Sequence, residues 1–306
     1  MENRLNPGIG ATLMSPAELQ EGIASLSRGV YFKEASLDMM LSILTESAAQ
    51  MSGVERVSIW ALTDDHRELS CLDLYERSSG QHSKGTSIDA GHYPAYFRAL
   101  QAGTCITADD AYLHPLTAEF ATDYLPRHNV TAMLDTPIHI RGELQGVLCL
   151  EQVASRHSWT SAHQLFAQAV ANLVTLALVE YEAEEARREA QVASERLRAV
   201  FDASRDALFL ADGDSGEILD VNRQAEALVG RARNELLGRH QGILHPAELQ
   251  KTMLGEFRQM LDGRLPWALA SEVQRSDGRK VPVEITAEVA DLGDGRRLAL
   301  SIFRPV

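Results

Sequence analysis

The feature that most constrains this chain is a highly charged stretch between two apolar segments. Residues 183–200 read AEEARREAQVASERLRAV and consist mainly of charged residues and alanine. The helical pattern begins near Thr160 and continues to near Val200, which predicts one helix of roughly 40 residues and roughly 60 Å. A helix this polar has no core to pack against and would be marginal by itself in water. We therefore expect two globular parts joined by a helix that needs a partner.

An apolar stripe along this helix predicts what the partner is. Apolar side chains recur in alternating steps of three and four residues, which is the spacing of a coiled-coil seam. If Leu176 takes the first heptad position, Glu182 of one chain faces Arg187 of a second, parallel chain. We expect a homodimer, and the alternative that stays open is a solvated rigid spacer held by charge pairs within one helix. The predicted seam comprises Leu176, Val179, Ala183, Ala186, Ala190, Ala193, Leu197 and Val200.

The centre of the seam is occupied only by alanine. Each alanine forgoes about 2 kcal/mol of apolar burial relative to leucine, at about 0.8 kcal/mol per methylene group. Bulkier residues hold the seam at both ends, so its middle is weakly fixed. This weakness predicts that the two helices can shift in register or rotation and so carry a signal.

Length and composition support two domains and exclude several classes of protein. The chain has 306 residues, of which 45% are hydrophobic, and this is enough for two cores. Its net charge of -14 opposes binding to nucleic acid or to anionic lipid. The three cysteines form no CxxC pair, so neither a disulfide framework nor a zinc site is indicated. No apolar run is long enough to cross a membrane, and the amino terminus does not read as a signal peptide. We therefore expect the protein in the reducing cytoplasm.

Local patterns divide the chain into segments. A helix is expected to start at Ser15, where Glu18 completes a capping box, and a second helix covers residues 37–51. The predicted organisation is a flexible amino terminus (1–14), a first domain (15–180), a linker helix (181–203) and a second domain (204–306). Within the first domain we expect strands at 54–62 and 68–76 and short helices at 94–102 and 114–128.

Two further strands, 131–140 and 144–153, are predicted to form a hairpin around Gly142. One face of this hairpin mixes carboxylates with apolar groups, with Asp135 opposite Cys149 and Glu151 opposite Met133, which predicts a polar cavity on that side. The opposite face is wholly apolar and must pack on helices: Ala132, Leu134, Ile138, Ile140, Leu144, Leu148 and Leu150.

The last hundred residues change to short strands with turns at Asp277-Gly278 and Asp294-Gly295. A helix is expected over 247–262. This pattern predicts an antiparallel sheet with helices on one side. The expected strands are 207–212, 217–222, 266–274, 280–290 and 296–303.

Residues 30–180 resemble a GAF domain of the kind found at the front of bacterial sensor proteins. The resemblance rests on the strings VSIWAL, YPAYFRAL, ITADDAYLHPLTAEF, YLPRHNVTAMLDTPI, GELQGVLCLEQV and RHSWT. The end of the chain resembles a PAS domain through SGEILDVNRQAEALVG, ELLGRHQGILHPAE and RSDGRKVPVEIT. The resemblance implies an α+β fold of two domains, each a central antiparallel sheet flanked by helices, joined by a long helix of coiled-coil type. Both families are sensory, form dimers and enclose a small-molecule cavity.

The GAF-like half lacks several ligand signatures of its family. It has no NKFDE string, no cysteine in a bilin-attachment context, and Met133 where nitric-oxide sensors have a cysteine. Cys149 lies in mid-strand without a basic neighbour and is expected to be a buried hydrophobe. For Asp135 and Glu151 we favour hydrogen bonds from loop amides that hold the excursion at 109–115 over ligand contact. The candidate ligand residues are Tyr96, Phe97, Tyr124, Met133, Asp135, Cys149 and Glu151, with Tyr93 and Phe120 completing an aromatic lid.

The PAS-like half also departs from its cofactor-binding relatives. Gln241 stands where photosensory flavin domains have a cysteine, and Met253 lies near the position of the haem histidine, while His245 belongs to an HP turn. These residues argue against covalent flavin and haem. The sequence agrees equally well with a packed core without ligand and with an apolar ligand pocket. Asn222 is expected to cap the helix that follows it. The candidate wall residues are Phe209, Val221, Leu236, Leu244, Phe257 and Trp267.

No nucleophile with its base and no metal-ligand triad is recognisable, so we expect no catalysis by these residues. The resemblance implies a sensory module that binds an unidentified small molecule and signals through a dimeric helix to an output domain, with cyclic-di-GMP turnover preferred. Two alternatives stay open: the sensor region of a histidine kinase, and a freestanding dimeric adaptor without ligand. We expect no metal, nucleic acid or membrane insertion.

Overall fold

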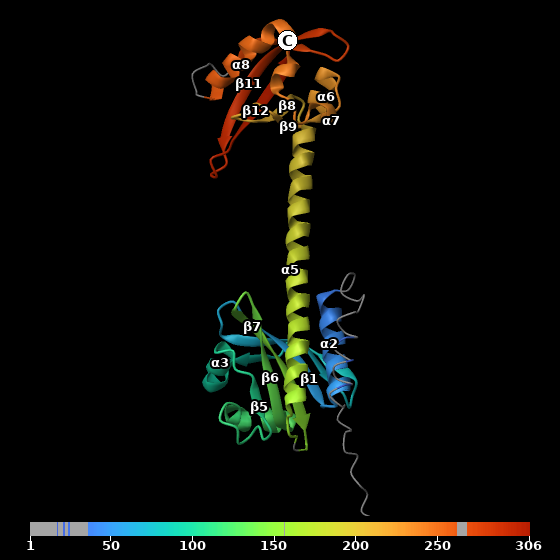
Figure 1. Cartoon of the computed structure of the whole chain (residues 1–306), viewed down its shortest axis with the longest axis vertical. Coiled ribbons are helices and arrows are strands. Elements are labelled where there is room, and N and C mark those ends of the chain that lie inside the picture. Colours follow the sequence, from blue (N-terminus) through green and yellow to red (C-terminus); the bar gives the residue numbers. More distant parts are fainter. Residues whose placement is uncertain (1–16, 18–20, 22–23, 25–35, 156, 262–267) are drawn as a thin grey trace, which may run out of the picture. The chain divides into compact units, whose positions relative to one another are not determined.

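The computed structural model describes Ala17, Glu21, Ala24 and residues 36–155, 157–261 and 268–306. The chain divides into two compact units, residues 1–186 and 187–306, and the division lies within the predicted linker helix (Figure 1). Three predictions lie outside the described residues: the flexible amino terminus (1–14), the capping box at Ser15 and Glu18, and the role of Trp267 as a wall residue.

The amino-terminal unit is built on an antiparallel sheet of seven strands. Their order is β3-β2-β1-β7-β6-β5, and β4 pairs with β2 beside β3. The strands are β1 (Arg56–Leu62), β2 (Glu68–Glu76), β3 (Gln81–Ser83), β4 (Ser87–Asp89), β5 (Ile106–Ala108), β6 (Val130–Ile140) and β7 (Glu143–Val153). Its helices are α2 (Leu37–Ser52), α3 (Pro94–Gln101), η2 (Ala118–Thr122), α4 (Tyr124–His128) and the first part of α5 (Ser161–Ala203).

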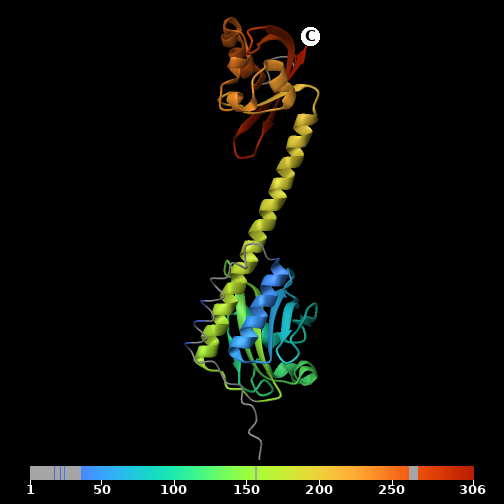
Figure 2. The same cartoon turned by 90° about the vertical axis from the view of Figure 1, so that its right-hand side faces the viewer.

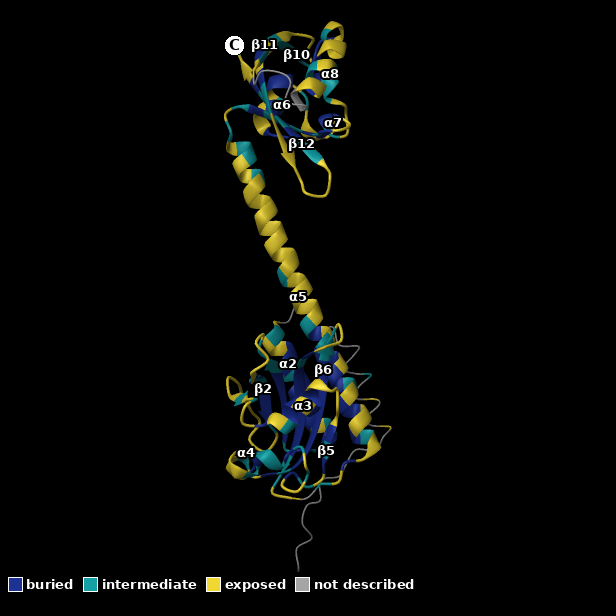
Figure 3. Ribbon diagram, turned by 90° about the vertical axis from the view of Figure 1, so that its left-hand side faces the viewer, coloured by how far each residue is buried: buried dark blue, intermediate teal, exposed yellow. Residues whose placement is uncertain are grey.

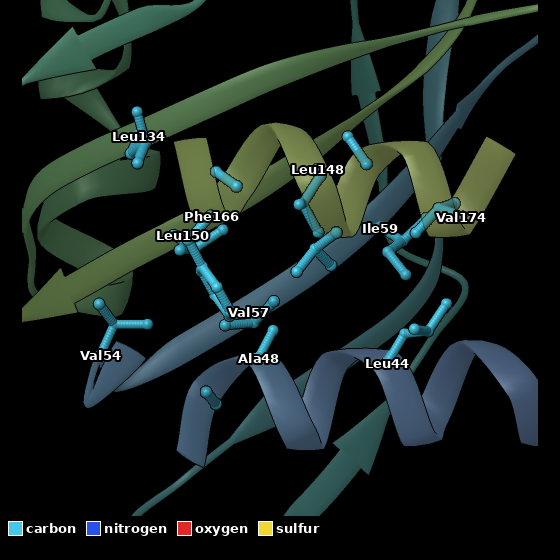
Figure 4. Close-up of a cluster of buried hydrophobic side chains, with 14 of the residues drawn as sticks. Leu44, Ala48, Val54, Val57, Ile59, Leu134, Leu148, Leu150, Phe166 and Val174 are labelled. Atoms are coloured by element: carbon cyan, nitrogen blue, oxygen red, sulfur yellow. The ribbon is translucent and has the colours of Figure 1, made fainter. Parts of the chain in front are cut away.

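Helices α2 and α5 cover one face of this sheet, as the apolar pattern of the hairpin predicts (Figure 2). Ser36 caps α2 through its side chain, and Gly53 ends it with a left-handed φ of 72°. Side chains from both helices and the central strands form one core, drawn in Figure 4: Leu44, Ala48, Val57, Ile59, Leu148, Leu150, Phe166 and Val174.

The β6–β7 hairpin has the predicted register over its central part. Asp135 pairs with Cys149 and Met133 pairs with Glu151. The predicted place of Leu144 is wrong, because a bulge between Ile138 and His139 shifts the register and sends Leu144 to the opposite face. A side chain could not replace Gly146 without backbone movement, since a Cβ there would lie 2.0 Å from the Trp60 carbonyl oxygen.

Helix α5 is a single element of 43 residues, in agreement with the sequence pattern. Among the described helices it alone is long and apolar enough to cross a membrane by length and composition, but 44% of its apolar window is buried within the chain. Phe166, Val170 and Val174 are among the side chains that pack on the sheet. Beyond Ala177 the helix is almost wholly exposed (Figure 3). All predicted seam residues, from Leu176 to Val200, are exposed in the single chain, as both the coiled-coil and the spacer interpretations require.

The carboxy-terminal unit contains a five-stranded antiparallel sheet of order β10-β11-β12-β8-β9. Apolar side chains of the helices and of one sheet face form its core. The strands are β8 (Ala207–Asp212), β9 (Ile218–Val221), β10 (Leu269–Gln274), β11 (Lys280–Asp291) and β12 (Arg297–Pro305). The helices are α6 (Arg223–Val229), α7 (Arg233–Leu236), η3 (Gln241–Leu244) and α8 (Ala247–Leu261).

Asn222 caps α6 as predicted and also ties that helix to the end of α5. Its side-chain oxygen accepts from the Ala225 amide at 2.9 Å, and its Nδ2 donates to the Phe201 carbonyl at 3.1 Å. Arg198 on α5 forms ion pairs with Asp202 at 2.9 Å and with Asp220 on β9 at 2.8 Å. The end of α5 is therefore held to the carboxy-terminal unit by polar contacts of fixed geometry.

Candidate functional site

A small cavity lies on the face of the amino-terminal sheet opposite to α2 and α5. Its volume of about 10 Å³ is close to the room that one water molecule needs. Aromatic, sulfur-bearing and aliphatic side chains line it together with one carboxylate. The lining residues are Trp60, Leu69, Ile88, Tyr96, Phe120, Tyr124, Met133, Val147, Cys149 and Glu151.

The predicted aromatic lid closes this cavity. Tyr93 stacks on Phe120 with ring centroids 4.1 Å apart, and Tyr96 meets the edge of Phe120 at 4.8 Å. The ring of Tyr124 is tilted against Phe120, with centroids 5.6 Å apart. The lid is carried by the short elements α3, η2 and α4, and Glu119 fixes α3 by accepting from the Ala95 amide at 2.9 Å.

Glu151 is held by an arginine rather than by loop amides. Its Oε2 accepts from Arg56 Nε at 2.9 Å, and its Oε1 accepts from the Tyr124 hydroxyl at 2.7 Å. Arg56 also donates to Glu76, and both Arg56 and Glu151 are buried. The charge of Glu151 is therefore balanced inside the fold.

The 109–115 excursion is fastened by groups other than Asp135 and Glu151, so the predicted loop-amide role of these two acids is wrong. Asp109 accepts from the Trp159 amide at 2.9 Å, and the Ala111 amide donates to the Thr131 carbonyl at 2.8 Å.

Asp135 lies beside the cavity without a partner. Its exposed fraction is 0%, and neither carboxylate oxygen has a hydrogen-bond partner among the described residues. Burial, with the nearby Glu151 carboxylate, raises the pKa of Asp135 from 3.8 to about 7. The Cys149 thiol and Tyr96 hydroxyl lie close enough to offset part of this rise, but neither meets hydrogen-bond geometry.

Cys149 behaves as the expected buried hydrophobe. Burial, and then the Asp135 carboxylate, raises the pKa of its thiol well above the ordinary value. Its Sγ lies 3.8 Å from the Tyr96 hydroxyl. A thiol of this kind is protonated at neutral pH and is a poor nucleophile.

The carboxy-terminal unit encloses a second cavity of about 20 Å³ between η3, α8 and the sheet. Gln241 Nε2 is buried there without a partner among the described residues. His245 Nδ1 lies 2.9 Å from the Glu272 carbonyl oxygen, and the Ser271 hydroxyl donates to Met253 Sδ at 3.2 Å. Burial lowers the pKa of His245 below its ordinary value, so this ring is neutral at neutral pH. In the described part of the chain, no three His, Cys, Asp or Glu residues are placed to hold a metal ion.

Two family matches explain both halves of this arrangement. The GAF domain family matches residues 36–178, which contain the cavity under the aromatic lid. The PAS fold family matches residues 195–306, which contain the second cavity. The chain contains a GAF domain followed by a PAS domain.

Individual proteins are more distantly similar. A protein of Azorhizobium caulinodans described as uncharacterized is 27% identical over 192 residues, which cover 60% of this chain and 25% of that protein. The chain thus spans about a quarter of the length of this relative.

Among solved structures, the GAF domain of a phosphoenolpyruvate-protein phosphotransferase from Coxiella burnetii is 17% identical, covers 56% of this chain and 99% of that one, and has a TM-score of 0.46. A PAS domain of an HTR-like protein from Haloarcula marismortui is 24% identical, covers 40% of this chain and 99% of that one, and has a TM-score of 0.34.

The GAF domain brings most of the predicted ligand residues together. Phe97 packs in the same cluster, and Asp135 lies beside it, without lining the cavity. Arg56 was missed, although a lone arginine in the apolar string VERVSIWAL signals a buried carboxylate partner. The residues that line the cavity are Tyr96, Tyr124, Met133, Cys149 and Glu151.

In the PAS domain the predicted wall residues lie mainly in the general core. Phe257 lines the cavity, whereas Phe209, Val221, Leu236 and Leu244 pack in the surrounding cluster. The polar lining residues were not predicted, since nothing in their local sequence marks them as cavity residues. They are His240, Gln241, His245 and Ser301.

Proposed function

We propose that this chain is the sensory region of a cytoplasmic bacterial signalling protein, in which a small molecule in the GAF cavity changes α5 and α5 passes the change to the PAS domain. The observation that carries this proposal is the continuity of α5. One helix of 43 residues begins in the GAF core and ends in a polar network of the PAS domain.

The GAF end of α5 packs on the sheet and is therefore expected to move when the sheet moves. Phe166, Val170 and Val174 pack on the face opposite to the cavity, in one cluster with Leu148 and Leu150 of β7. Strand β7 also carries Cys149 and Glu151 to the cavity side. A movement of β7 therefore acts on both the cavity and the helix, because neighbouring side chains of one strand point to opposite faces.

The PAS end of α5 is fixed to β9 and α6 through Arg198, Asp202 and Asn222. The Arg223 amide at the start of α6 donates to Asp202 at 3.1 Å. A rotation of the last turn of α5 would break or bend several of these hydrogen bonds together. The PAS domain is thus expected to follow the helix.

Dimerisation through the seam, in parallel orientation, completes the proposal. The seam residues are exposed, and the last two, Leu197 and Val200, also line an open groove with Leu208, Leu210 and Leu300 of the PAS sheet. Exposed apolar surface that continues from helix to sheet favours a second copy of the chain as its cover.

We infer the output only by resemblance. GAF and PAS pairs of this type precede cyclic-di-GMP turnover enzymes, which we prefer, or histidine kinases. In either case the residues described here sense and transmit, and catalysis would belong to another domain or protein.

A second candidate function is a freestanding dimeric adaptor. The volumes of the two cavities, about 10 and about 20 Å³, favour it, because side chains fill most of the space that a ligand would need. In an adaptor the signal would be a protein bound at the surface.

Native mass spectrometry of freshly purified protein tests the proposal, since it reports subunit number and retained small molecules together. A dimer with a bound metabolite supports sensing, and a dimer without one favours the adaptor. A monomer at micromolar concentration would remove the physical basis of transmission along paired helices.

A further inference from the structure

Asp135 is a buried acid whose hydrogen-bonding capacity is unused. Both of its oxygens are enclosed, and neither has a partner among the described residues. An ionised carboxylate can accept about four hydrogen bonds, and burying it without them costs several kcal/mol. Native proteins rarely leave a buried polar group in this condition. The nearby Tyr96 hydroxyl and Cys149 thiol do not meet hydrogen-bond geometry with Asp135, so the missing donors must come from a ligand.

Of the two carboxylates near the cavity, only Glu151 has a positively charged partner within the described part of the chain. Arg56 and the Tyr124 hydroxyl satisfy Glu151. No cation approaches Asp135 among the described residues, and its other charged or titratable neighbours are Glu151 and Cys149 on β7, Tyr96 on α3 and Cys105 before β5. With Asp135 ionised, the site carries one uncompensated negative charge.

The walls of the cavity suit a cation. The aromatic rings of Trp60, Tyr96, Phe120 and Tyr124 surround it. Ring faces attract ammonium and guanidinium groups, and aromatic enclosures with a nearby carboxylate are a common means of recognising organic cations. The carboxylate supplies the hydrogen bonds and the rings supply the enclosing surface.

We propose that the GAF cavity binds a compact organic cation of the alkylammonium or alkylguanidinium class, whose N–H groups donate to both oxygens of Asp135. This inference rests on the proposed sensory function and names the class of its ligand. A guanidinium group matches a carboxylate through two parallel hydrogen bonds. The cavity holds little more than a water molecule and Asp135 lies beside it, so the rings of Tyr96 and Phe120 must move outward to admit the ligand and then enclose it.

Binding of the cation is coupled to release of a proton. Burial keeps Asp135 protonated below about pH 7, and the carboxyl must ionise to pair with the ligand. The apparent affinity therefore rises with pH. Between about pH 6 and about pH 8 the ionised fraction of a group titrating near 7 grows about tenfold, so we expect about a tenfold gain in affinity.

Calorimetric titration of the full chain tests this inference. The probes are methylammonium and methylguanidinium, with methylurea as the neutral control of the same shape as methylguanidinium. At about pH 6 we expect at least one of the cations to bind with release of nearly one proton, detected by repeating the titration in buffers of different ionisation enthalpy. Methylurea should not bind measurably and should release no proton.

The variant Asp135→Asn keeps the shape and removes the charge. It should lose cation binding, whereas Asp64→Asn, which changes an exposed acid of the same domain, should bind as the parent does. The comparison of cations with methylurea needs no variant and stands even if Asp135→Asn folds poorly.

Three results would overturn the inference: equal binding of methylurea, cation binding that Asp135→Asn leaves intact, or no binding of either cation at millimolar concentration. These results are distinct from failure of the proposed function. If native mass spectrometry finds a neutral or anionic metabolite on the dimer, sensing stands and the cation inference falls.

Discussion

Strand β7 carries Glu151 next to β1, where Arg56 is its direct cross-strand neighbour. Both side chains are buried. A buried ion pair repays its desolvation only when further hydrogen bonds satisfy the remaining atoms. Tyr124 supplies such a bond to Glu151, and Glu76 supplies another acceptor for Arg56.

We expect Arg56→Met to destabilise the GAF domain by about 3–5 kcal/mol, because it leaves the Glu151 carboxylate buried and unbalanced. Chemical denaturation measures the change. The double variant Arg56→Met with Glu151→Gln should recover a large part of the loss, since no uncompensated charge remains. Arg77→Met, at an exposed position of the same domain, should change stability by less than about 0.5 kcal/mol. Equal losses for the two arginines would contradict the assigned role of Arg56.

Asp135 predicts an unusual pH dependence of stability. Folding raises its pKa from 3.8 to about 7, so the folded chain keeps a proton that the unfolded chain has already lost. Its contribution to stability is fully present below 3.8 and is lost as the pH rises through about 7. The two pKa values correspond to at most about 4 kcal/mol.

The variant Asp135→Asn isolates this contribution. Relative to the parent chain it should gain about 2.5 kcal/mol of stability as the pH is raised from about 5 to about 8, because the rest of the effect of Asp135 falls below pH 5. Urea denaturation at several pH values measures the difference, and Asp64→Asn should follow the parent throughout. A constant difference between Asp135→Asn and the parent would mean that Asp135 titrates as an ordinary acid.

At the scale of elements, a glycine is required in a strand of the GAF sheet but not in a helix of the PAS domain. Gly146 on β7 lies against the backbone of β1, where a Cβ would meet the Trp60 carbonyl oxygen at 2.0 Å. Gly255 lies on the exposed side of α8, and a Cβ added there would have no atom within 4 Å. Close approach of two strands requires the first glycine, and no contact requires the second.

We therefore expect opposite effects from the same substitution. Gly146→Ala should destabilise the GAF domain by at least about 2 kcal/mol, because backbone cannot give way as a flexible side chain can. Gly255→Ala should stabilise the PAS domain by up to about 1 kcal/mol through helix propensity. Thermal unfolding of both variants measures these changes. Tolerance of alanine at Gly146 would show that β1 and β7 separate more easily than their register suggests.

At the scale of the whole molecule, the decisive question is what covers the stripe along α5. The coiled-coil interpretation requires a second chain, and the spacer interpretation requires none. Ala190 lies on the predicted seam and Gln191 lies beside it, outside the seam, and both are exposed. This adjacent pair allows a matched test.

We expect Ala190→Leu to tighten a dimer at least about tenfold, since each added methylene contributes about 0.8 kcal/mol on burial. Gln191→Leu should leave the dissociation constant nearly unchanged. Sedimentation equilibrium measures both constants. Equal effects of the two leucines would favour the solvated spacer.

The central part of the predicted seam, which contains only alanine, leads to a prediction about signalling. Replacing Ala183, Ala186, Ala190 and Ala193 by leucine should lock the helices and abolish coupling between cavity occupancy and hydrogen exchange in the PAS sheet. Inserting two residues at Ala190 should uncouple the domains by breaking the heptad phase. Coupling that survives the four leucines would contradict transmission through movement in the seam.

Local patterns in the sequence were sufficient for the length of α5, the cap at Asn222 and the pairing of Asp135 with Cys149. Each of these depends on side-chain periodicity or turn chemistry within a few dozen residues, where neighbours in sequence are also neighbours in space.

Only the tertiary structure placed Arg56 on Glu151, turned Leu144 to the other face, and left Asp135 without a partner among the described residues. It also put His245 and Gln241 on the PAS cavity. These features arise where segments far apart in the chain meet, or where a bulge changes the register by one residue. A side-chain period of two then reverses every face beyond the bulge, and no local pattern records that change.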